Sequence, residues 1–274
     1  MKMLVCTIGS AQRKHTLGFA SVVAVALSAE ITLLGVVRQK SKIEDLGQKL
    51  MLDAQSLSEQ GIPVQVRVEA GDAESVVMGE IESNTYDMVV LGALGQKRSR
   101  RKLVDSVAMR IIEKARTSVL LVKGSRRDIS RVLICASASE YGHLAIWAGA
   151  AIGCGASAKA TVLHVVGPMP TMYAGLEQME ETLAELLQSE TEMARELKWA
   201  AQVVRAECEI SELKLRRGLA ADEILQEGSE GDYDLIVLGS SLAGGGPFRA
   251  LMGDLTREIV TRSQRPVLVV RPIS

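Results

Sequence analysis

The stretch MVVLGALGQKRSRRKLVDSV, residues 88–107, combines three features suited to binding an anion. It begins as a buried strand and breaks at Gly92 and Gly95, where a backbone without Cβ atoms can bring its amides close to a phosphate. A helix expected to start near Asp105 and Ser106 would add its N-terminal amides and the positive end of its dipole. Between the glycines and this helix lie five basic residues: Lys97, Arg98, Arg100, Arg101 and Lys102.

These features also have simpler interpretations. Gly-x-x-Gly occurs in many turns that bind nothing, and a basic run is often a solvated face of a loop and helix. For the basic residues the sequence leaves open a solvated face, attraction of phosphate, or contact with a partner's acidic surface. No Gly-Lys-Ser/Thr occurs in the chain, which argues against P-loop hydrolysis. No aromatic residues alternate with the basic ones, which argues against nucleic acid.

The composition limits the classes of protein to consider. The chain has 274 residues, of which 47% are apolar and only 3% aromatic, and this favours two domains built from sheets between small-residue helices. The net charge of −1 gives no general attraction to nucleic acid or to an acidic membrane surface. The longest apolar runs, residues 20–27 and 146–152, fall short of the ~20 residues of a membrane-spanning helix. We therefore expect neither a membrane nor a nucleic-acid partner.

The cysteines and histidines give little sign of chemistry. Cys6, Cys135, Cys154 and Cys208 are scattered without a C-x-x-C pair, and the N-terminus lacks a signal sequence, so we expect a reduced, cytoplasmic protein. His15 and His143 are expected at polar positions early in a helix, and His164 as a buried, hydrogen-bonded core residue. No triad or carboxylate pair suggests turnover, so we expect no catalytic residues and at most slow ATP hydrolysis.

An internal repeat organises the chain. MLVCTIGSA at Met3 matches VLICASASE at Val132, and ITLLGVV at Ile31 matches ATVLHVV at Ala160, in both cases 129 residues apart. YDMVVLG at Tyr86 matches YDLIVLG at Tyr233 at a larger spacing of 147, so the second copy contains an insertion. These matches predict two tandem domains, residues 1–125 and 130–274.

Each copy alternates short apolar runs with amphipathic stretches. Runs such as 31–37, 88–91 and 119–122 predict strands covered on both faces, and 16–29 and 73–83 predict helices between them. The fold class is therefore α/β, with two tandem doubly wound five-stranded parallel-sheet domains and ligand sites at the carboxyl ends of the strands. The insertion is expected to be one long helix over about 176–204, either packed on the domain or serving as a dimerisation or partner arm.

The tandem repeat, the strands ending in VVLG or IVLG before a glycine-rich loop, and the closing PVLVV strand resemble universal stress proteins in their two-domain form. The resemblance covers nearly the whole chain. It implies an adenine-nucleotide α-hydrolase-like fold whose two last strands pair antiparallel. One branch of that family binds ATP through a strand-4 loop of pattern G-x2-G-x9-G-[ST], whereas another branch lacks the pattern and does not bind.

The family pattern is only partly present. In the first copy Gly92, Gly95 and Ser106 match, but Asp105 replaces the third glycine. In the second copy Gly239 and Gly253 match, whereas Leu242 and Asp254 replace the second glycine and the hydroxyl. A carboxylate about 4 Å from a phosphate charge costs roughly 1 kcal/mol in water and about 4 kcal/mol at a protein surface, unless Mg²⁺ bridges the two.

The resemblance implies a nucleotide site in each copy for ATP, ADP or AMP. In the first copy it would comprise Thr7, Ile8, Gly9, Val37, Gly71, Gly92, Ala93, Gly95, Asp105, Ser106 and Val107. In the second copy it would comprise Ala136, Ser137, Val165, Gly218, Gly239, Ser240, Ser241, Gly253, Asp254 and Leu255. The alternative is an interaction protein of the same fold that has lost its nucleotide. A homodimer and a regulatory protein partner both stay open at this point.

Overall fold

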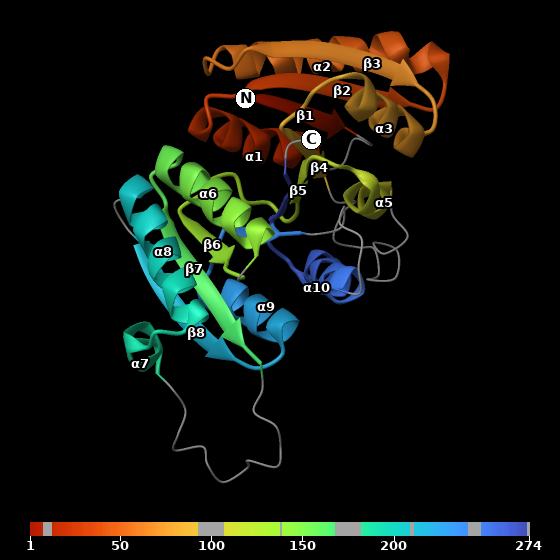
Figure 1. The fold of residues 1–274 in the computed structure, drawn as a ribbon. Helices are drawn as coiled ribbons and strands as arrows, with labels where there is room; N and C mark the ends of the chain where they lie inside the picture. Colours follow the sequence, from red (N-terminus) through yellow and green to blue (C-terminus); the bar gives the residue numbers. More distant parts are fainter. Residues whose placement is uncertain are drawn as a thin grey trace.

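A computed structural model describes residues 1–7, 13–92, 107–137, 139–167, 182–208, 211–240 and 248–272. Within these ranges the strands form a ten-stranded sheet in the order β3-β2-β1-β4-β5-β10-β9-β6-β7-β8 (Figure 1). The first copy supplies β1 (Lys2–Thr7), β2 (Glu30–Val37), β3 (Val64–Ala70), β4 (Met88–Gly92) and β5 (Ser118–Val122). The second supplies β6 (Arg131–Cys135), β7 (Lys159–Val166), β8 (Ser211–Arg217), β9 (Leu235–Gly239) and β10 (Val267–Val270).

Each copy has the strand order expected of a doubly wound sheet, and the fold-class prediction is confirmed. The strands within a copy are parallel, with the first strand between the second and the fourth. The two halves join where β5 and β10 pair antiparallel, with Leu120 opposite Leu268. Both leucines are fully buried, so this junction is an interior part of the sheet.

Two layers of helices cover the sheet (Figure 1). One layer contains α1 (Arg13–Ala26), α2 (Ile43–Ser58), α6 (Glu140–Gly155) and α8 (Glu192–Glu207). The other contains α3 (Ala73–Ser83), α5 (Val107–Lys114), α9 (Ala220–Glu230) and α10 (Phe248–Arg262). The remaining described helices are the short η1 (Lys40–Lys42) and α7 (Leu183–Gln188). No described helix is long and apolar enough to cross a membrane.

The hydrophobic core is divided by sheet face rather than by repeat. Val5 and Ile134, from the two copies, belong to one cluster, and Leu4 and Leu133 belong to the cluster on the opposite face. This division follows from the period-two alternation of strand side chains in a continuous sheet. The two copies therefore share both cores.

The insertion differs from the single helix that the sequence predicts. Its described part contains two helices, because Ser189 ends α7 and the Thr191 side chain caps α8 by accepting from the Ala194 amide at 3.2 Å. Thr182 forms a capping box with Glu185 at the start of α7. Serine and threonine hydroxyls compete for backbone groups and so favour helix ends. The apolar stripe through Leu197, Ala200 and Val204 is buried as expected.

Candidate functional site

A pocket of about 190 Å³ opens at the carboxyl ends of the second copy's strands. Strands β6, β7 and β9 form its floor, and α9 and α10 form its walls. Five predicted site residues line it: Ala136, Ser137, Val165, Gly239 and Leu255. The other lining residues are Cys135, Leu163, His164, Ala220, Ile224, Leu238 and Thr256.

The described side chains that line this pocket carry no fixed charge. Burial lowers the pKa of His164, and burial raises the pKa of the Cys135 thiol, so both are neutral near pH 7. The other lining side chains are apolar, hydroxyl-bearing or absent. Such a pocket suits a flat, uncharged ring rather than a phosphate.

Gly218 places α9 against the pocket. It follows β8 with a φ of +149°, a backbone conformation that side-chain-bearing residues rarely adopt. A Cβ atom there would lie 2.5 Å from Oε1 of Glu223 in α9. Gly218 therefore permits the tight turn into α9, whose Ala220 and Ile224 form one wall, but it is not among the residues that line the pocket.

The strand-4 glycines lie where a helix crosses the end of their strand. A Cβ on Gly239 would stand 2.0 Å from the carbonyl oxygen of Tyr141 in α6, and one on Gly92 would stand 2.4 Å from Oγ1 of Thr16 in α1. Close helix packing is thus one requirement for glycine at both positions. It brings the start of α6 beside the pocket.

The first turn of α6 is fixed by serines. Ser139 caps the helix by accepting a hydrogen bond from the Gly142 amide at 3.1 Å, and its hydroxyl lies 3.0 Å from that of Ser137. The Ala136 amide donates to the Leu163 carbonyl at 2.8 Å. Ala136 and Ser137 are therefore held in place at the rim, beside a capped helix N-terminus.

Ser240, the residue after Gly239, has a buried hydroxyl without a hydrogen-bond partner in the described residues. Its side chain is 1% exposed, and its amide donates to the Val270 carbonyl at 3.1 Å. A buried hydroxyl without a partner is costly, and a ligand at the strand end would remove that cost.

The first-copy site is described only in part. Thr7, Val37 and Gly92 end β1, β2 and β4, Gly71 follows β3, and Val107 begins α5. The Gly71 amide donates to the Val37 carbonyl at 2.9 Å, which ties two of these strand ends together. The strand-end residues lie at the carboxyl edge of the parallel strands, where the sequence predicts the site.

Several predicted site residues lie outside the described ranges or away from the expected position. Outside the description are Ile8, Gly9, Ala93, Gly95, Asp105, Ser106 and Ser241, together with the basic residues 97–102. Gly253 and Asp254 fall inside α10, which begins at Phe248. Amides beyond the first four of a helix bond within it, so these two do not provide a helix N-terminus.

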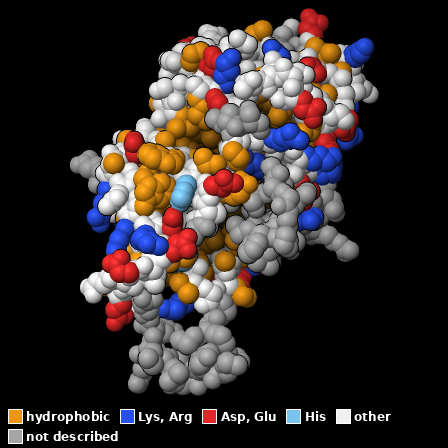
Figure 2. Space-filling view, viewed as in Figure 1, with side chains coloured by type: hydrophobic (Ala, Val, Ile, Leu, Met, Phe, Trp, Pro, Cys, Tyr) orange, Lys and Arg blue, Asp and Glu red, His pale blue; other side chains and the backbone are white. Residues whose placement is uncertain are grey.

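His143 serves a contact between helices. Its Nε2 lies 2.6 Å from Oε2 of Glu196 in α8, and its ring lies 4.3 Å from that of Trp199. Trp147 packs edge-on against Trp199 and is 49% exposed. Figure 2 shows hydrophobic side chains gathered on this face, over α1 and α6. A polar helix position, as the sequence predicts, describes His143 well.

His164 is buried and hydrogen-bonded as expected, and it also borders the pocket. Its exposure is 8%, and its Nδ1 lies 3.3 Å from the Ala136 carbonyl oxygen. Its position directly before Val165, near the end of a strand, was a signal that it would lie beside the crevice. Sequence reasoning missed this second role.

The described part of the chain contains no cluster of side chains typical of a metal site. No group of three or more His, Cys, Asp or Glu side chains there is arranged to hold one. Asp105 lies outside the described ranges, so the expected bridging of phosphate through Mg²⁺ at this residue stays a prediction.

Comparisons with known proteins agree on the fold. The model of the universal stress protein family matches residues 1–123 and 129–271. A universal stress protein from Archaeoglobus fulgidus superposes with a TM-score of 0.71 at 20% identity, covering 100% of this chain and 97% of that one. A functionally unknown protein from Pseudomonas aeruginosa PAO1 gives 0.73 at 18% identity, covering 99% and 92%.

A domain of a different kind of protein has a similar fold. The cytoplasmic domain of a prokaryotic cation chloride cotransporter superposes with a TM-score of 0.62 at 14% identity, covering 98% of this chain and 95% of that domain. At such identities the similarity concerns the fold alone. No curated protein matches this chain.

Proposed function

Because the chain belongs to the universal stress protein family, we propose that it is a stress-response binding module whose small ligand is an adenine nucleotide. The observation that carries the proposal is the pocket at the carboxyl ends of β6, β7 and β9, whose described lining is uncharged and whose residue Gly239 directly precedes Ser240 with its buried, unpartnered hydroxyl. Crevices at this end of an open α/β sheet are the usual ligand sites of such folds.

The pocket and the glycine loop would bind different parts of the nucleotide. The adenine ring would lie between Val165 of β7, Ile224 of α9 and Leu255 of α10, where no charge opposes it. The phosphates would leave the pocket past Gly239 and contact Ser240 and Ser241. Gly253 and Asp254 would then act from within α10 and not through free helix amides.

The first copy would bind a nucleotide in the corresponding place. Thr7, Ile8, Gly9 and Val37 would surround the nucleoside, and Gly71 would let the base approach. The phosphates would contact Gly92, Ala93, Gly95, Asp105, Ser106 and Val107, and the basic residues 97–102 would offset the charge of Asp105. Mg²⁺ between Asp105 and the phosphates would further reduce that repulsion.

The test compares two substitutions that introduce the same side chain one residue apart. Ala220→Phe fills the second-copy pocket, whereas Leu219→Phe adds the ring at a residue that is 64% exposed and does not line it. We expect calorimetric titration with Mg·ATP to show at least tenfold weaker binding at this site for Ala220→Phe, and wild-type binding for Leu219→Phe. Ala73→Phe makes the equivalent change in the first copy.

Native occupancy gives an independent measurement. Purified protein is heat-denatured and filtered, and the filtrate is analysed for AMP, ADP and ATP by chromatography. About one equivalent of nucleotide supports the proposal. No released nucleotide, together with no heat on adding Mg·ATP, would favour an interaction protein that has lost its ligand. Hydrolysis well above buffer would instead favour an enzyme.

A further inference from the structure

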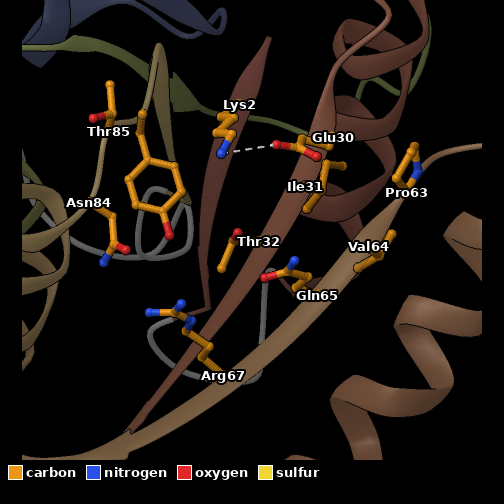
Figure 3. Close-up of a pocket in the computed structure, with 11 residues that line it drawn as sticks. Lys2, Glu30, Ile31, Thr32, Pro63, Val64, Gln65, Arg67, Asn84 and Thr85 are labelled. Atoms are coloured by element: carbon orange, nitrogen blue, oxygen red, sulfur yellow. Dashed lines mark ion pairs between the residues drawn. The ribbon is translucent and has the colours of Figure 1, made fainter.

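A second pocket, of about 390 Å³, lies at the opposite end of the strands in the first copy. It occupies the amino-terminal halves of β1, β2 and β3, beside the turn that follows α3 (Figure 3). The polar lining residues are Lys2, Glu30, Thr32, Gln65, Arg67, Asn84, Thr85 and Tyr86, and the others are Ile31, Pro63 and Val64. None of these residues belongs to the proposed nucleotide sites.

The pocket is an open trough with a paired charge at each end. At one end Lys2 Nζ lies 3.5 Å from Glu30 Oε1, and both side chains are about half exposed or more. At the other end Arg67 Nη1 donates to both carboxylate oxygens of Glu80, at 2.9 and 3.1 Å. Figure 3 shows Thr32 and Gln65 between these two ends. The formal charges of the four ionic groups cancel.

A buried network holds the Arg67 end in place. The Glu80 side chain is only 5% exposed and accepts hydrogen bonds from three residues. Besides Arg67, these are Tyr86 through its hydroxyl at 2.5 Å and Asn84 through Nδ2 at 3.1 Å. The satisfied, buried carboxylate of Glu80 therefore holds Nη1 of Arg67 at the pocket's edge.

The repeat supplies an internal comparison, because the second copy builds part of the same network, with Gly231 in the place of Asn84. Lys214 Nζ donates to Glu227 at 2.8 Å and the Tyr233 hydroxyl donates to it at 3.1 Å, in the places of Arg67, Glu80 and Tyr86. The amides of Lys2 and Arg131 likewise donate to Asp87 and Asp234. The framework is therefore common to both copies.

The two copies differ in the side chains over this framework. In the second copy Lys159 bonds Glu212 at 2.5 Å, and Arg131 lies over the Tyr233 ring at 5.0 Å. The threonine beneath, Thr161, is completely buried. In the first copy Glu30 and Gln65 stand at the positions of Lys159 and Glu212. Glutamine is neutral and cannot form this ion pair, Glu30 instead pairs with Lys2, and Thr32 stays partly exposed.

We propose that the first-copy trough binds a neutral, polyhydroxylated small molecule of sugar or polyol type. Glu30, Gln65, Arg67 and Asn84 are planar groups that each present two polar atoms side by side, which suits pairs of adjacent hydroxyls. Thr32 and Thr85 add hydroxyls that can donate or accept. The volume lies within the range of small-molecule pockets.

The paired charges select against an ionic ligand. An anion at Lys2 or Arg67 would meet the carboxylate of Glu30 or Glu80, and a cation at either carboxylate would meet its basic partner. A charged ligand would therefore have to compete with an existing ion pair, whereas hydroxyls can bond to both members of a pair at once. This preference does not depend on nucleotide binding at the other end of the sheet.

The test exchanges residues between the copies. E30K/Q65E gives the first copy the ion pair of the second, and K159E/E212Q gives the second copy the Glu and Gln of the first, with Gly231 and Asp232 still in the places of Asn84 and Thr85. The probes are glucose, trehalose and sorbitol, with glucose 6-phosphate and glucosamine as charged counterparts. Amide shift perturbation on the full chain measures binding and its location.

For the wild type we expect saturable shifts at Thr32 and Gln65 with at least one neutral probe. We expect at least tenfold weaker binding of the charged analogues. E30K/Q65E should weaken the neutral probe at least tenfold, while K159E/E212Q should create new shifts at Thr161. Mg·ATP titration should be unchanged in both variants, so loss of nucleotide binding would be a separate failure.

Three results would overturn the proposal. They are equal or tighter binding of glucose 6-phosphate, undiminished binding by a folded E30K/Q65E variant, and no shifts at Thr32 or Gln65 with any neutral probe. If E30K/Q65E fails to fold, K159E/E212Q decides alone: the absence of new shifts at Thr161 then counts against the proposal.

Discussion

Gly92 and Gly239 occupy equivalent positions in the two copies. Helix packing around them explains the need for glycine independently of the loop pattern. Each lies at the end of a fourth strand where the first helix of its copy passes within a side-chain radius. Helix packing excludes a Cβ atom at both places, and the proposed phosphate binding would exclude it too. A substitution there is therefore expected to change stability whether or not a ligand binds.

The two glycines should differ in their tolerance of alanine. In Gly239→Ala the new Cβ would meet a backbone oxygen at 2.0 Å, so α6 must move, and we expect a loss of about 1 to 3 kcal/mol in the free energy of unfolding. In Gly92→Ala it would meet the hydroxyl of Thr16, which can rotate, so the loss should be smaller. Urea denaturation measures both.

Gly79→Ala is the matched control for these variants. Gly79 lies within α3 with no atom within 4 Å of its added Cβ, so alanine should stabilise the helix by about 0.5 to 1 kcal/mol. Equal losses at Gly92 and Gly239 would show that helix packing does not set the requirement for glycine.

At the residue scale the sequence predicts which positions reach the carboxyl edge but not how side chains meet across strands. Ala136, Ser137, Val165, Gly239 and Leu255 lie around one pocket because the ends of parallel strands share an edge. The pocket at the amino-terminal ends of the first-copy strands stays open because no ion pair forms between the described side chains of β2 and β3 there, unlike Lys159 and Glu212 in the second copy. The signal for it is the difference between Gln65 and Glu212, visible only once the strand register is known.

At the element scale, each copy ends its last strand with a cation that crosses to the other copy. Lys123 follows β5, and its Nζ donates to the carbonyls of Val260 and Ser263 at the end of α10. Arg271 follows β10 and donates to the carbonyls of Ile112 and Ala115 at the end of α5. Helix C-termini carry unpaired carbonyls and partial negative charge, so these cations join the two copies reciprocally.

Lys123 should make stability depend on pH in the alkaline range. Burial lowers its pKa from 10.5 to about 8, so between these values the unfolded chain binds more protons than the folded one. The free energy of unfolding contributed by Lys123 therefore rises with pH from about 8 to 10.5, by roughly 3 kcal/mol. Arg271, whose pKa burial lowers to about 10, adds to this only above that pH.

The Lys123 contribution is measured as a difference between wild type and Lys123→Met. Burial raises the pKa of the Cys6 and Cys135 thiols, so their contributions fall as pH rises above 9 and would hide a simple trend. Both proteins retain these thiols, and the difference isolates the lysine. Lys49→Met, at an exposed lysine of α2, controls for the loss of one charge. A flat difference from pH 8 to 10 would contradict the prediction.

The helix ends also explain where element prediction succeeds and fails. The buried stripe of α8 is readable from its three- and four-residue spacing, whereas the break before it depends on Ser189 and Thr191 bonding to backbone groups. Glu190 interrupts the apolar stripe at this point and was the available signal. Capping, rather than hydrophobic period, determines the boundary.

At the scale of the whole molecule, periodicity and the repeat predict two parallel sheets, but neither predicts that they merge. The junction depends on two uncharged final strands meeting antiparallel, and only the family resemblance implies this pairing in advance. Once β5 and β10 pair, each helical layer packs over strands of both copies. A continuous core of this kind should unfold as one unit.

Tryptophan fluorescence provides a test of this cooperativity, because Trp147 and Trp199 are the chain's two tryptophans and both lie in the second copy. Val5→Ala creates a cavity in the first copy, at a fully buried position of β1, and should cost about 2 to 3 kcal/mol. If the shared cores couple the copies, urea denaturation followed by fluorescence and by far-ultraviolet circular dichroism should shift together.

Leu268→Ala separates this coupling from a local effect. Leu268 lies opposite Leu120 at the junction of the two halves, so its truncation weakens the contact on which joint unfolding depends. In the Leu268→Ala variant, the urea midpoints measured by fluorescence and by circular dichroism should therefore begin to differ. If fluorescence in Val5→Ala keeps the wild-type midpoint while dichroism becomes biphasic, the two copies unfold independently, and the continuous sheet does not make them one cooperative unit.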